Sequence, residues 1–294
     1  MDKIKISDKT KQLIVNMQIN ELTEYYIYNA IAKRVKDKNN REVLEKIGAE
    51  ELAHSNIWKK YSERDAKPKR GKIFFMKLVS LVMGFTFAIK LMENGEELAS
   101  GEYKKLIEEV PEAEKIMADE QRHENELIEL LDEERLQYVG SMVLGLNDAL
   151  VELTGTLAGL TFAMQNTRLV ALSGLITGIS ATLSMASSEY LAAKNKGDAN
   201  AFKSCVYTGI AYVITVALLV LPYLIFPSDG YVAALAVMIV IVILIIAFFN
   251  YYISVAKSQP FKRRFFEMAA ISLSVALISF IIGLFVKKFL GIEI

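Results

Sequence analysis

The sequence predicts an all-α protein in which a soluble bundle of four helices precedes a membrane domain of five spanning helices. The composition combines 53% hydrophobic with 23% charged residues, which is too apolar for an ordinary soluble protein and too charged for one lying wholly in a membrane. Most of the charge lies before residue 139, and apolar blocks separated by short basic gaps follow. We therefore expect two domains, residues 1–137 and residues 138–294.

The first half predicts four helices and shows no strand pattern. Apolar side chains recur at helical spacing over 10–36, and the polar segment KDKNN separates this helix from a second one over 41–63. A basic segment precedes a third helix over 73–99, and Pro111 stands where the start of a fourth helix tolerates proline. The third helix is nearly as apolar as a spanning segment, but lysines interrupt it, so we expect a buried bundle helix. The alternative is a helix that touches the bilayer surface.

One element is expected to join the two halves. From Glu112 to Met164 the chain contains no proline, and its first glycine is Gly140. A single helix over this range would cross a bilayer and still project into water, since each residue adds about 1.5 Å. We expect the fourth bundle helix to continue into the first span, which would let occupancy of a soluble site bias a gate in the membrane.

The chain has two histidines, and both stand in the same pattern, Glu51-x-x-His54 and Glu120-x-x-His123. Residues three apart share a helix face, so each pair can direct two ligands to one point. Two such helices, with a glutamate from each of two others, form a carboxylate-bridged site for two metal ions in a four-helix bundle. A single Glu-x-x-His is more often a solvated face, but its occurrence at both histidines favours the metal site. The predicted ligands are Glu21, Glu51, His54, Glu93, Glu96, Glu120 and His123, with Glu24 as an alternative to Glu21.

The first half resembles rubrerythrin and the wider ferritin-like family over roughly residues 10–135. The resemblance rests on the segments ELTEYYIYNAIA, AEELAH, MENGEE and DEQRHE. It implies a ferritin-like bundle in which Glu51 and Glu120 bridge two metal ions and the other ligands are terminal or switching. Oxygen-rich ligands with imidazole suit iron, with manganese as the alternative.

Cysteine usage limits the chemistry of this half. Rubrerythrins usually carry a four-cysteine iron site that supplies electrons to the metal pair, and a chain with the single cysteine Cys205 cannot build one. Ferroxidase or peroxidase activity stays open, but peroxidase turnover would need an outside reductant. The same count excludes disulfide frameworks and iron–sulfur clusters. The formal net charge of zero argues against a nucleic-acid binder.

The second half contains five apolar blocks, each long enough to cross about 30 Å of hydrocarbon as a helix. Lysines and arginines gather in the gaps after the second and the fourth block. By the positive-inside rule these gaps and the N-terminal domain lie in the cytoplasm and the C-terminus lies outside. The first residues lack a signal-peptide run, which agrees with this orientation. We expect an integral protein of the plasma membrane of a prokaryote, with spans over 139–164, 169–192, 205–226, 231–254 and 266–287.

Few ionisable residues lie within these blocks. Asp148 and Glu152 are four residues apart on the first span, and Met185 and Glu189 repeat that spacing on the second. A charge near the bilayer centre costs about 3 kcal/mol, so such residues normally line a cavity or pathway. The alternatives are that Glu189 sits among the headgroups and that Met185 is core packing. A thioether beside carboxylates nevertheless suits a divalent ion that must bind and then leave.

The segments GLNDALVELTGTLAGL and SATLSMASSEYLAAK are similar to the first two spans of the vacuolar iron transporter family. The resemblance covers residues 138–290 and implies export of ferrous iron from the cytosol in exchange for protons, with Asp148, Met185 and Glu189 in the ion path. Two features depart from the family. Ala149 replaces the usual glycine of Asn-Asp-Gly, and Glu152 adds a carboxylate. Plant members carry a metal-binding insert after the second span, where this chain has only NKGDANAFK, so the ferritin-like domain is expected to replace it.

These observations predict a proton-coupled exporter of ferrous iron, with manganese as a further substrate, whose N-terminal domain binds, senses or oxidises iron. The fusion resembles the membrane-bound ferritin-like transporters. The partners are Fe²⁺, protons and the lipid bilayer. The pairs Gly155-x-x-x-Gly159 and Gly174-x-x-x-Gly178 allow close helix approach, which with the family's habit favours a homodimer. The alternative function is a membrane-anchored di-iron oxidase or peroxidase.

Overall fold

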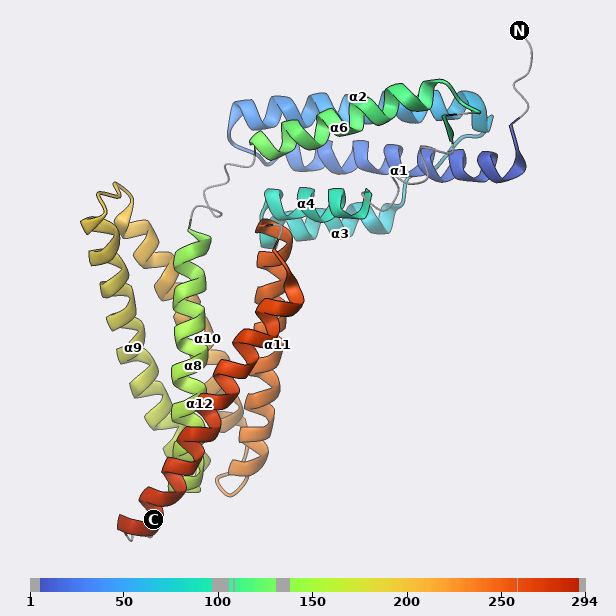
Figure 1. The fold of residues 1–294 in the computed structure, drawn as a ribbon. Coiled ribbons are helices and arrows are strands. Elements are labelled where there is room, and N and C mark those ends of the chain that lie inside the picture. Colours follow the sequence, from blue (N-terminus) through green and yellow to red (C-terminus); the bar gives the residue numbers. More distant parts are fainter. Residues whose placement is uncertain (1–5, 97–105, 108, 131–137, 258, 291–294) are drawn as a thin grey trace. The chain divides into compact units, whose positions relative to one another are not determined.

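The structure is a computed structural model that describes residues 6–96, 106–107, 109–130, 138–257 and 259–290. Within these ranges all regular secondary structure is helical, in ten helices, which confirms the predicted class (Figure 1). The chain divides into two compact units, Met1–Glu133 and Glu134–Ile294, and each is described by itself.

The first unit contains helices on both sides of a short basic connection. Side-chain caps define the starts of the first two helices: Ser7 accepts from the Thr10 amide, and Asp37 accepts from the Asn40 amide. Helices α1 and α2 lie side by side, and α6 runs along α2 (Figure 1). The helices of this unit are α1 (Asp8–Ala32), α2 (Lys38–Ser62), α3 (Arg70–Met83), α4 (Phe85–Glu96) and α6 (Glu112–Leu130).

The prediction of one continuous third helix is wrong. Gly84 adopts φ 98° and ψ 157°, a conformation that glycine reaches without a steric penalty, and it separates α3 from α4. Helix α4 is buried as expected, through Phe87, Ala88, Ile89 and Met92. In α3 only Met76 is buried, so the expectation of a buried bundle helix fails for this segment.

Hydrophobic and polar layers alternate along the first unit. One apolar cluster includes Ile14 and Trp58, and a second includes Ile31 and Leu44. On each of α1, α2 and α6 the predicted metal ligands lie between the residues that join these two clusters. The acidic and histidine side chains therefore form a polar layer enclosed at both ends by packed hydrophobic residues.

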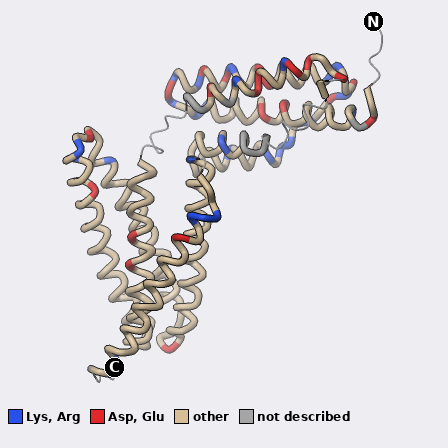
Figure 2. Tube along the Cα trace, viewed as in Figure 1, with Lys and Arg blue, Asp and Glu red and all other residues tan. Residues whose placement is uncertain are grey.

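The second unit consists of the five helices that are long and apolar enough to cross a membrane, which confirms the predicted number of spans. Charged residues are sparse along them (Figure 2). They are α8 (Val139–Met164), α9 (Thr167–Asn195), α10 (Ala201–Ile225), α11 (Tyr231–Lys257) and α12 (Phe261–Leu290). Helix α6 ends at Leu130 and α8 begins at Val139; the predicted continuity between them falls on 131–137, outside the described residues.

The glycine pairs of the predicted close-approach motifs lie against other helices of the same chain. A Cβ on Gly155 would lie 2.8 Å from Val275 Cγ1, and one on Gly159 would lie 3.0 Å from the Ser279 carbonyl oxygen, so both glycines admit α12 against α8. A Cβ on Gly178 would lie 2.5 Å from Val216 of α10. These close approaches are used within one chain, so they give no support to the predicted homodimer.

Candidate metal sites

Three helices of the first unit bring five predicted ligands together. Glu21 comes from α1, Glu51 and His54 from α2, and Glu120 and His123 from α6. One ligand atom from each of Glu21, Glu51, His54 and Glu120 lies within 4.8 Å of the others. His123 Nδ1 lies 3.1 Å from Glu51 Oε1 and 3.7 Å from Glu120 Oε2. We call these five residues the acidic–histidine cluster.

Four buried atoms of this cluster make no well-formed hydrogen bond: Glu51 Oε2, His54 Nδ1, Glu120 Oε1 and His123 Nδ1. They face one another at ion-pair distances, with His54 Nδ1 3.2 Å from Glu120 Oε1 and 3.7 Å from Glu51 Oε2. Leaving such atoms without a well-formed hydrogen bond inside a protein is costly, and native structures contain few of them. They are carboxylate oxygens and imidazole nitrogens, the donor types that suit iron and manganese. The donor set and these four atoms therefore fit a divalent metal ion.

The far sides of both histidine rings meet carboxylates. His54 Nε2 lies 3.3 Å from Asp119 Oδ2, and His123 Nε2 lies 2.6 Å from Glu50 Oε2. Arg122 Nη2 lies 3.0 Å from both of these carboxylates and so joins them. Carboxylates in this position fix the tautomer and orientation of a ligating imidazole. The sequence did not predict these three residues, whose only signal is that they stand next to predicted ligands in the chain.

Without a metal ion, charges within the cluster compensate one another. Burial favours neutral His54, but the Glu120 and Glu51 carboxylates beside its ring raise its pKa to about 9. Burial acts likewise on His123, and the same carboxylates raise its pKa to about 10. Burial and then Glu51 raise the pKa of Glu21; burial opposes ionisation of Glu51, but Glu21 and the two histidines lower its pKa. Near neutral pH the cluster therefore holds protons where a metal would supply positive charge.

The remaining predicted ligands of this unit have separate outcomes. Glu24 forms an ion pair with Lys72, at 2.9 Å, and the cluster takes Glu21 instead. Glu93 and Glu96 belong to the last turn of α4, and their side chains lie outside the described part of the chain.

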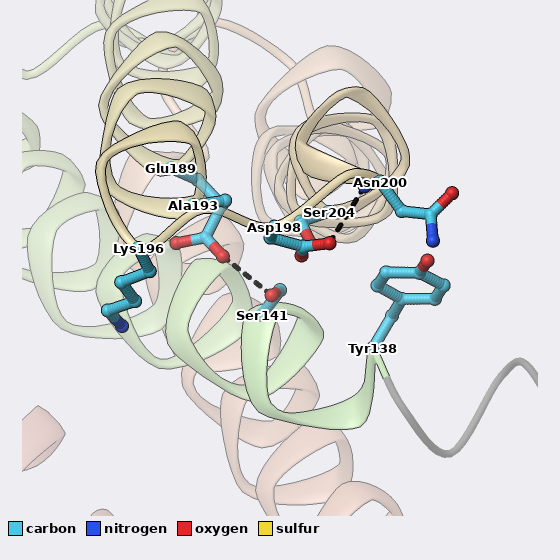
Figure 3. Close-up of a pocket in the computed structure, with 8 residues that line it drawn as sticks. All are labelled: Tyr138, Ser141, Glu189, Ala193, Lys196, Asp198, Asn200 and Ser204. Carbon is cyan, nitrogen blue, oxygen red and sulfur yellow. Dashed lines mark hydrogen bonds between the residues drawn. The ribbon is translucent and has the colours of Figure 1, made fainter.

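In the second unit, Glu189 lines a pocket at the end of α9. Its Oε1 accepts a hydrogen bond of 2.6 Å from Ser141 Oγ of α8 (Figure 3). The pocket has a volume of about 250 Å³. Asp198 lies in the same pocket, and its carboxylate accepts from the Asn200 amide at 2.7 Å. The lining residues are Tyr138, Ser141, Glu189, Ala193, Lys196, Asp198, Asn200 and Ser204.

Asp148 and Glu152 are both exposed on α8. Tyr212 of α10 donates a hydrogen bond of 2.8 Å to Glu152 Oε2. The sequence does not reveal this contact, because Tyr212 is one of three tyrosines in its apolar block. Met185 packs partly buried against the hydrophobic core of the unit. Among the described residues, the carboxylates of Asp148, Glu152 and Glu189 do not converge on one metal-sized point. In this arrangement Glu189 is held by Ser141 and Glu152 by Tyr212.

The helices that carry these acids are similar to part of a known protein family. Residues 139–201 match the model of the VIT family. The matched range contains α8 and α9 whole, and with them Asp148, Glu152, Met185 and Glu189. The match and the five apolar helices together support an integral membrane protein, and the match suggests a transporter of metal ions. Searches of curated proteins and of solved structures return no match.

Proposed function

We propose that this protein exports ferrous iron from the cytoplasm in exchange for protons. The observation that carries the proposal is that all in-span carboxylates of α8 and α9 lie inside the range matched by the VIT family. A helix that only anchors a protein gains nothing from acids within its apolar span, each of which costs about 3 kcal/mol at the bilayer centre. Acids on two adjacent spans are instead suited to a cation path.

Proton exchange follows from the chemistry of the same groups. A carboxylate that binds Fe²⁺ must be deprotonated, so metal and proton compete for it. The Ser141 hydroxyl orients Glu189, and the Tyr212 hydroxyl orients Glu152. In the proposed cycle Glu189 accepts iron at the pocket and Asp148 with Glu152 take it further, while protons move in the opposite direction.

The acidic–histidine cluster supports a second role for iron in the first unit. The ligands of this cluster would hold iron or manganese: Glu21, Glu51, His54, Glu120 and His123. Bound iron would supply redox chemistry, or its binding would let the protein sense the iron concentration. The side chains of this chain orient the ligands and hold the protons that the metal displaces. We propose that the first unit is a ferritin-like bundle that lies in the cytoplasm and collects, senses or oxidises iron. The whole protein would lie in the plasma membrane of a prokaryote, with its C-terminus outside.

A homodimer belongs to the proposal for a reason other than the glycine pairs. Asp148 and Glu152 are exposed in the single chain, on a helix that is apolar enough to span a bilayer. Facing lipid with two carboxylates is unfavourable by about 3 kcal/mol for each charge. A second copy packed on this side of α8 would remove both from hydrocarbon and enclose the path.

The test uses full-length protein in liposomes that contain an iron-sensitive and a pH-sensitive dye. We expect the parent to move Fe²⁺ and Glu189→Gln to move little, because the amide cannot exchange a proton for a metal. Glu267→Gln is the matched control, since this exposed acid pairs with Arg263 of its own helix. Equal flux through all three proteins would refute the proposed path.

The second candidate is a membrane-anchored di-iron oxidase or peroxidase, favoured by the four buried atoms of the acidic–histidine cluster that make no well-formed hydrogen bond. It predicts that iron-dependent consumption of oxygen or peroxide persists in Asp148→Asn and Glu189→Gln proteins and stops in Glu120→Gln. If the parent also moves no metal, the oxidase stands and the exporter falls.

A further inference from the structure

Helix α3 carries an apolar face that the described structure leaves uncovered. Phe74 is 72% exposed, Leu81 is 60% exposed and Val82 is 62% exposed. Together with Phe75 and Leu78, which are also exposed, they stand at offsets of one, four, seven and eight from Phe74, the spacing of one helix face. The opposite side of α3 packs into the unit through Met76, Ile73 and Val79. We call Phe74, Phe75, Leu78, Leu81 and Val82 the apolar face of α3.

The contrast with α4 shows that this exposure is particular to α3. The two helices follow one another across Gly84, and both consist largely of apolar residues. Helix α4 places Phe87, Ile89 and Met92 in the core, each no more than 4% exposed. The unit therefore has room to bury an apolar helix and leaves the neighbouring one open. Open apolar faces of this kind mark binding surfaces.

The charged residues within the segment that contains α3 have a single sign. No acidic residue occurs between Asp65 and Glu93, whereas the interval contains Lys67, Lys69, Arg70, Lys72, Lys77 and Lys90 (Figure 2). Lys69 Nζ donates to Asn20 Oδ1 at 2.8 Å and Lys72 Nζ pairs with Glu24 at 2.9 Å, so these two serve contacts within the unit. Lys67, Arg70 and Lys77 are exposed at the start and the middle of the helix.

We propose that α3 lies in the plane of a bilayer surface, with its apolar face among the lipid chains just below the headgroups and its basic side chains on anionic lipid. An apolar face flanked by lysine and arginine is the pattern of interfacial helices, and basic residues near an anionic leaflet each contribute about 1 kcal/mol. A second copy fits the surface less well, because it would bring two basic segments together. The chain also carries its own candidate spans, which tether this unit to a bilayer. The inference holds whatever the protein transports.

The test places a fluorophore on the apolar face of α3 in the full-length protein. Cys205→Ser removes the single cysteine, and Leu78→Cys introduces a labelling site at the middle of the face. The control is Glu42→Cys on α2, whose side chain is 61% exposed and belongs to no apolar patch. Both proteins are labelled with a polarity-sensitive dye and reconstituted into vesicles of phosphatidylcholine with about one third phosphatidylglycerol. Quenching is measured with a nitroxide lipid and with iodide in the water.

The label at Leu78 is expected to be quenched by the nitroxide lipid and protected from iodide, and the label at Glu42 is expected to show the reverse. Quenching of the Leu78 label by iodide alone would overturn the proposal. Protection from both quenchers would also overturn it, because protein and not lipid would then cover the face. Cross-linking of the Leu78→Cys protein through its thiols would identify that cover as a second copy.

A second variant tests whether the basic side chains of this segment bind anionic lipid. Lys67→Gln, Arg70→Gln and Lys77→Gln, made together, should weaken docking by about fivefold for each residue changed, as should vesicles of phosphatidylcholine alone. If neither the triple variant nor vesicles of phosphatidylcholine alone changed lipid quenching at Leu78, the anionic surface would be refuted as the partner. The circular dichroism of the triple variant should equal that of the parent, since all three side chains are exposed.

Discussion

Binding of divalent metal to the acidic–histidine cluster should release protons. In metal-depleted protein the pKa of His54 is about 9 and that of His123 about 10, so both rings are protonated at neutral pH. Ligation needs neutral imidazole, so both protons must leave when metal binds. Glu21, whose pKa is raised by burial and by Glu51, holds a further proton that a bound metal displaces.

The size and sign of the effect follow from these groups. Each displaced proton makes the apparent affinity rise about tenfold per pH unit for as long as its group stays protonated. With both histidines titrating, affinity should rise about a hundredfold per unit above neutral pH and level off as the pH passes 9 and then 10. The affinity for metal rises with pH because a proton competes with the metal for each imidazole, and a raised histidine pKa keeps that proton bound at low pH.

Calorimetric titration measures the released protons directly. Mn²⁺, which avoids oxidation, is titrated into metal-depleted full-length protein at neutral pH in two buffers of different ionisation enthalpy. We expect about two to three protons per filled cluster. His54→Gln should release about one fewer, and the exposed Glu42→Gln should match the parent. Release of less than one proton in the parent, or an affinity independent of pH, would refute the assigned ligands.

Four other outcomes are expected. A histidine pKa above the ordinary 6.5 stabilises the metal-depleted fold below that pH, and the stabilisation is lost as the pH rises through 9. At about 1.4 kcal/mol per pKa unit, His54 contributes at most about 3.5 kcal/mol. The thermal unfolding midpoint should therefore fall as the pH approaches 10, and a constant midpoint would contradict the ion pairs. Arg122→Gln should weaken Mn²⁺ binding by about tenfold or more, because it releases Asp119 and Glu50, and Arg122→Lys should rescue binding in part. Arg41→Gln, a change at a half-buried arginine that is not part of the cluster, should bind as the parent does. Tyr212→Phe should slow metal flux by about tenfold because Glu152 loses a hydrogen bond worth about 1.5–3 kcal/mol, and Tyr223→Phe, whose hydroxyl instead contacts Thr161, should not; equal rates would remove Glu152 from the path. Gly283→Ala should lower the unfolding midpoint, by about 1–3 kcal/mol of stability, because its Cβ would collide with the Gly159 carbonyl oxygen, while Gly209→Ala meets only Ala186 Cβ at 3.5 Å and should be neutral.

Helical periodicity and hydropathy were sufficient to predict the five spans and the helical class, because both depend on local composition. The pairing of Glu51 with His54 and of Glu120 with His123 was also visible, since residues three apart necessarily share a helix face. The break at Gly84 was not, because a glycine inside an apolar helix is common and its φ of 98° depends on how the following segment packs.

Contacts between helices set the rest of the candidate sites. Asp119 and Arg122 look like a solvated helix face in the sequence, and only packing of α6 beside α2 brings them to Glu50 and His54. Tyr212 meets Glu152 across sixty residues of chain, which no local pattern records. The glycine pairs did predict close helix approach, but not that α12 and α10 are the helices that approach.

The most direct test of the account is whether a proton gradient drives ferrous iron uphill. Full-length protein in liposomes is given equal Fe²⁺ on both sides and a pH step across the membrane. The account predicts that iron accumulates on the acidic side in the parent, that Glu189→Gln abolishes the accumulation, and that Glu267→Gln leaves it unchanged. Iron that stays equally distributed in the parent under the pH step, while protein-dependent flux down an iron gradient persists, would contradict proton exchange by these carboxylates.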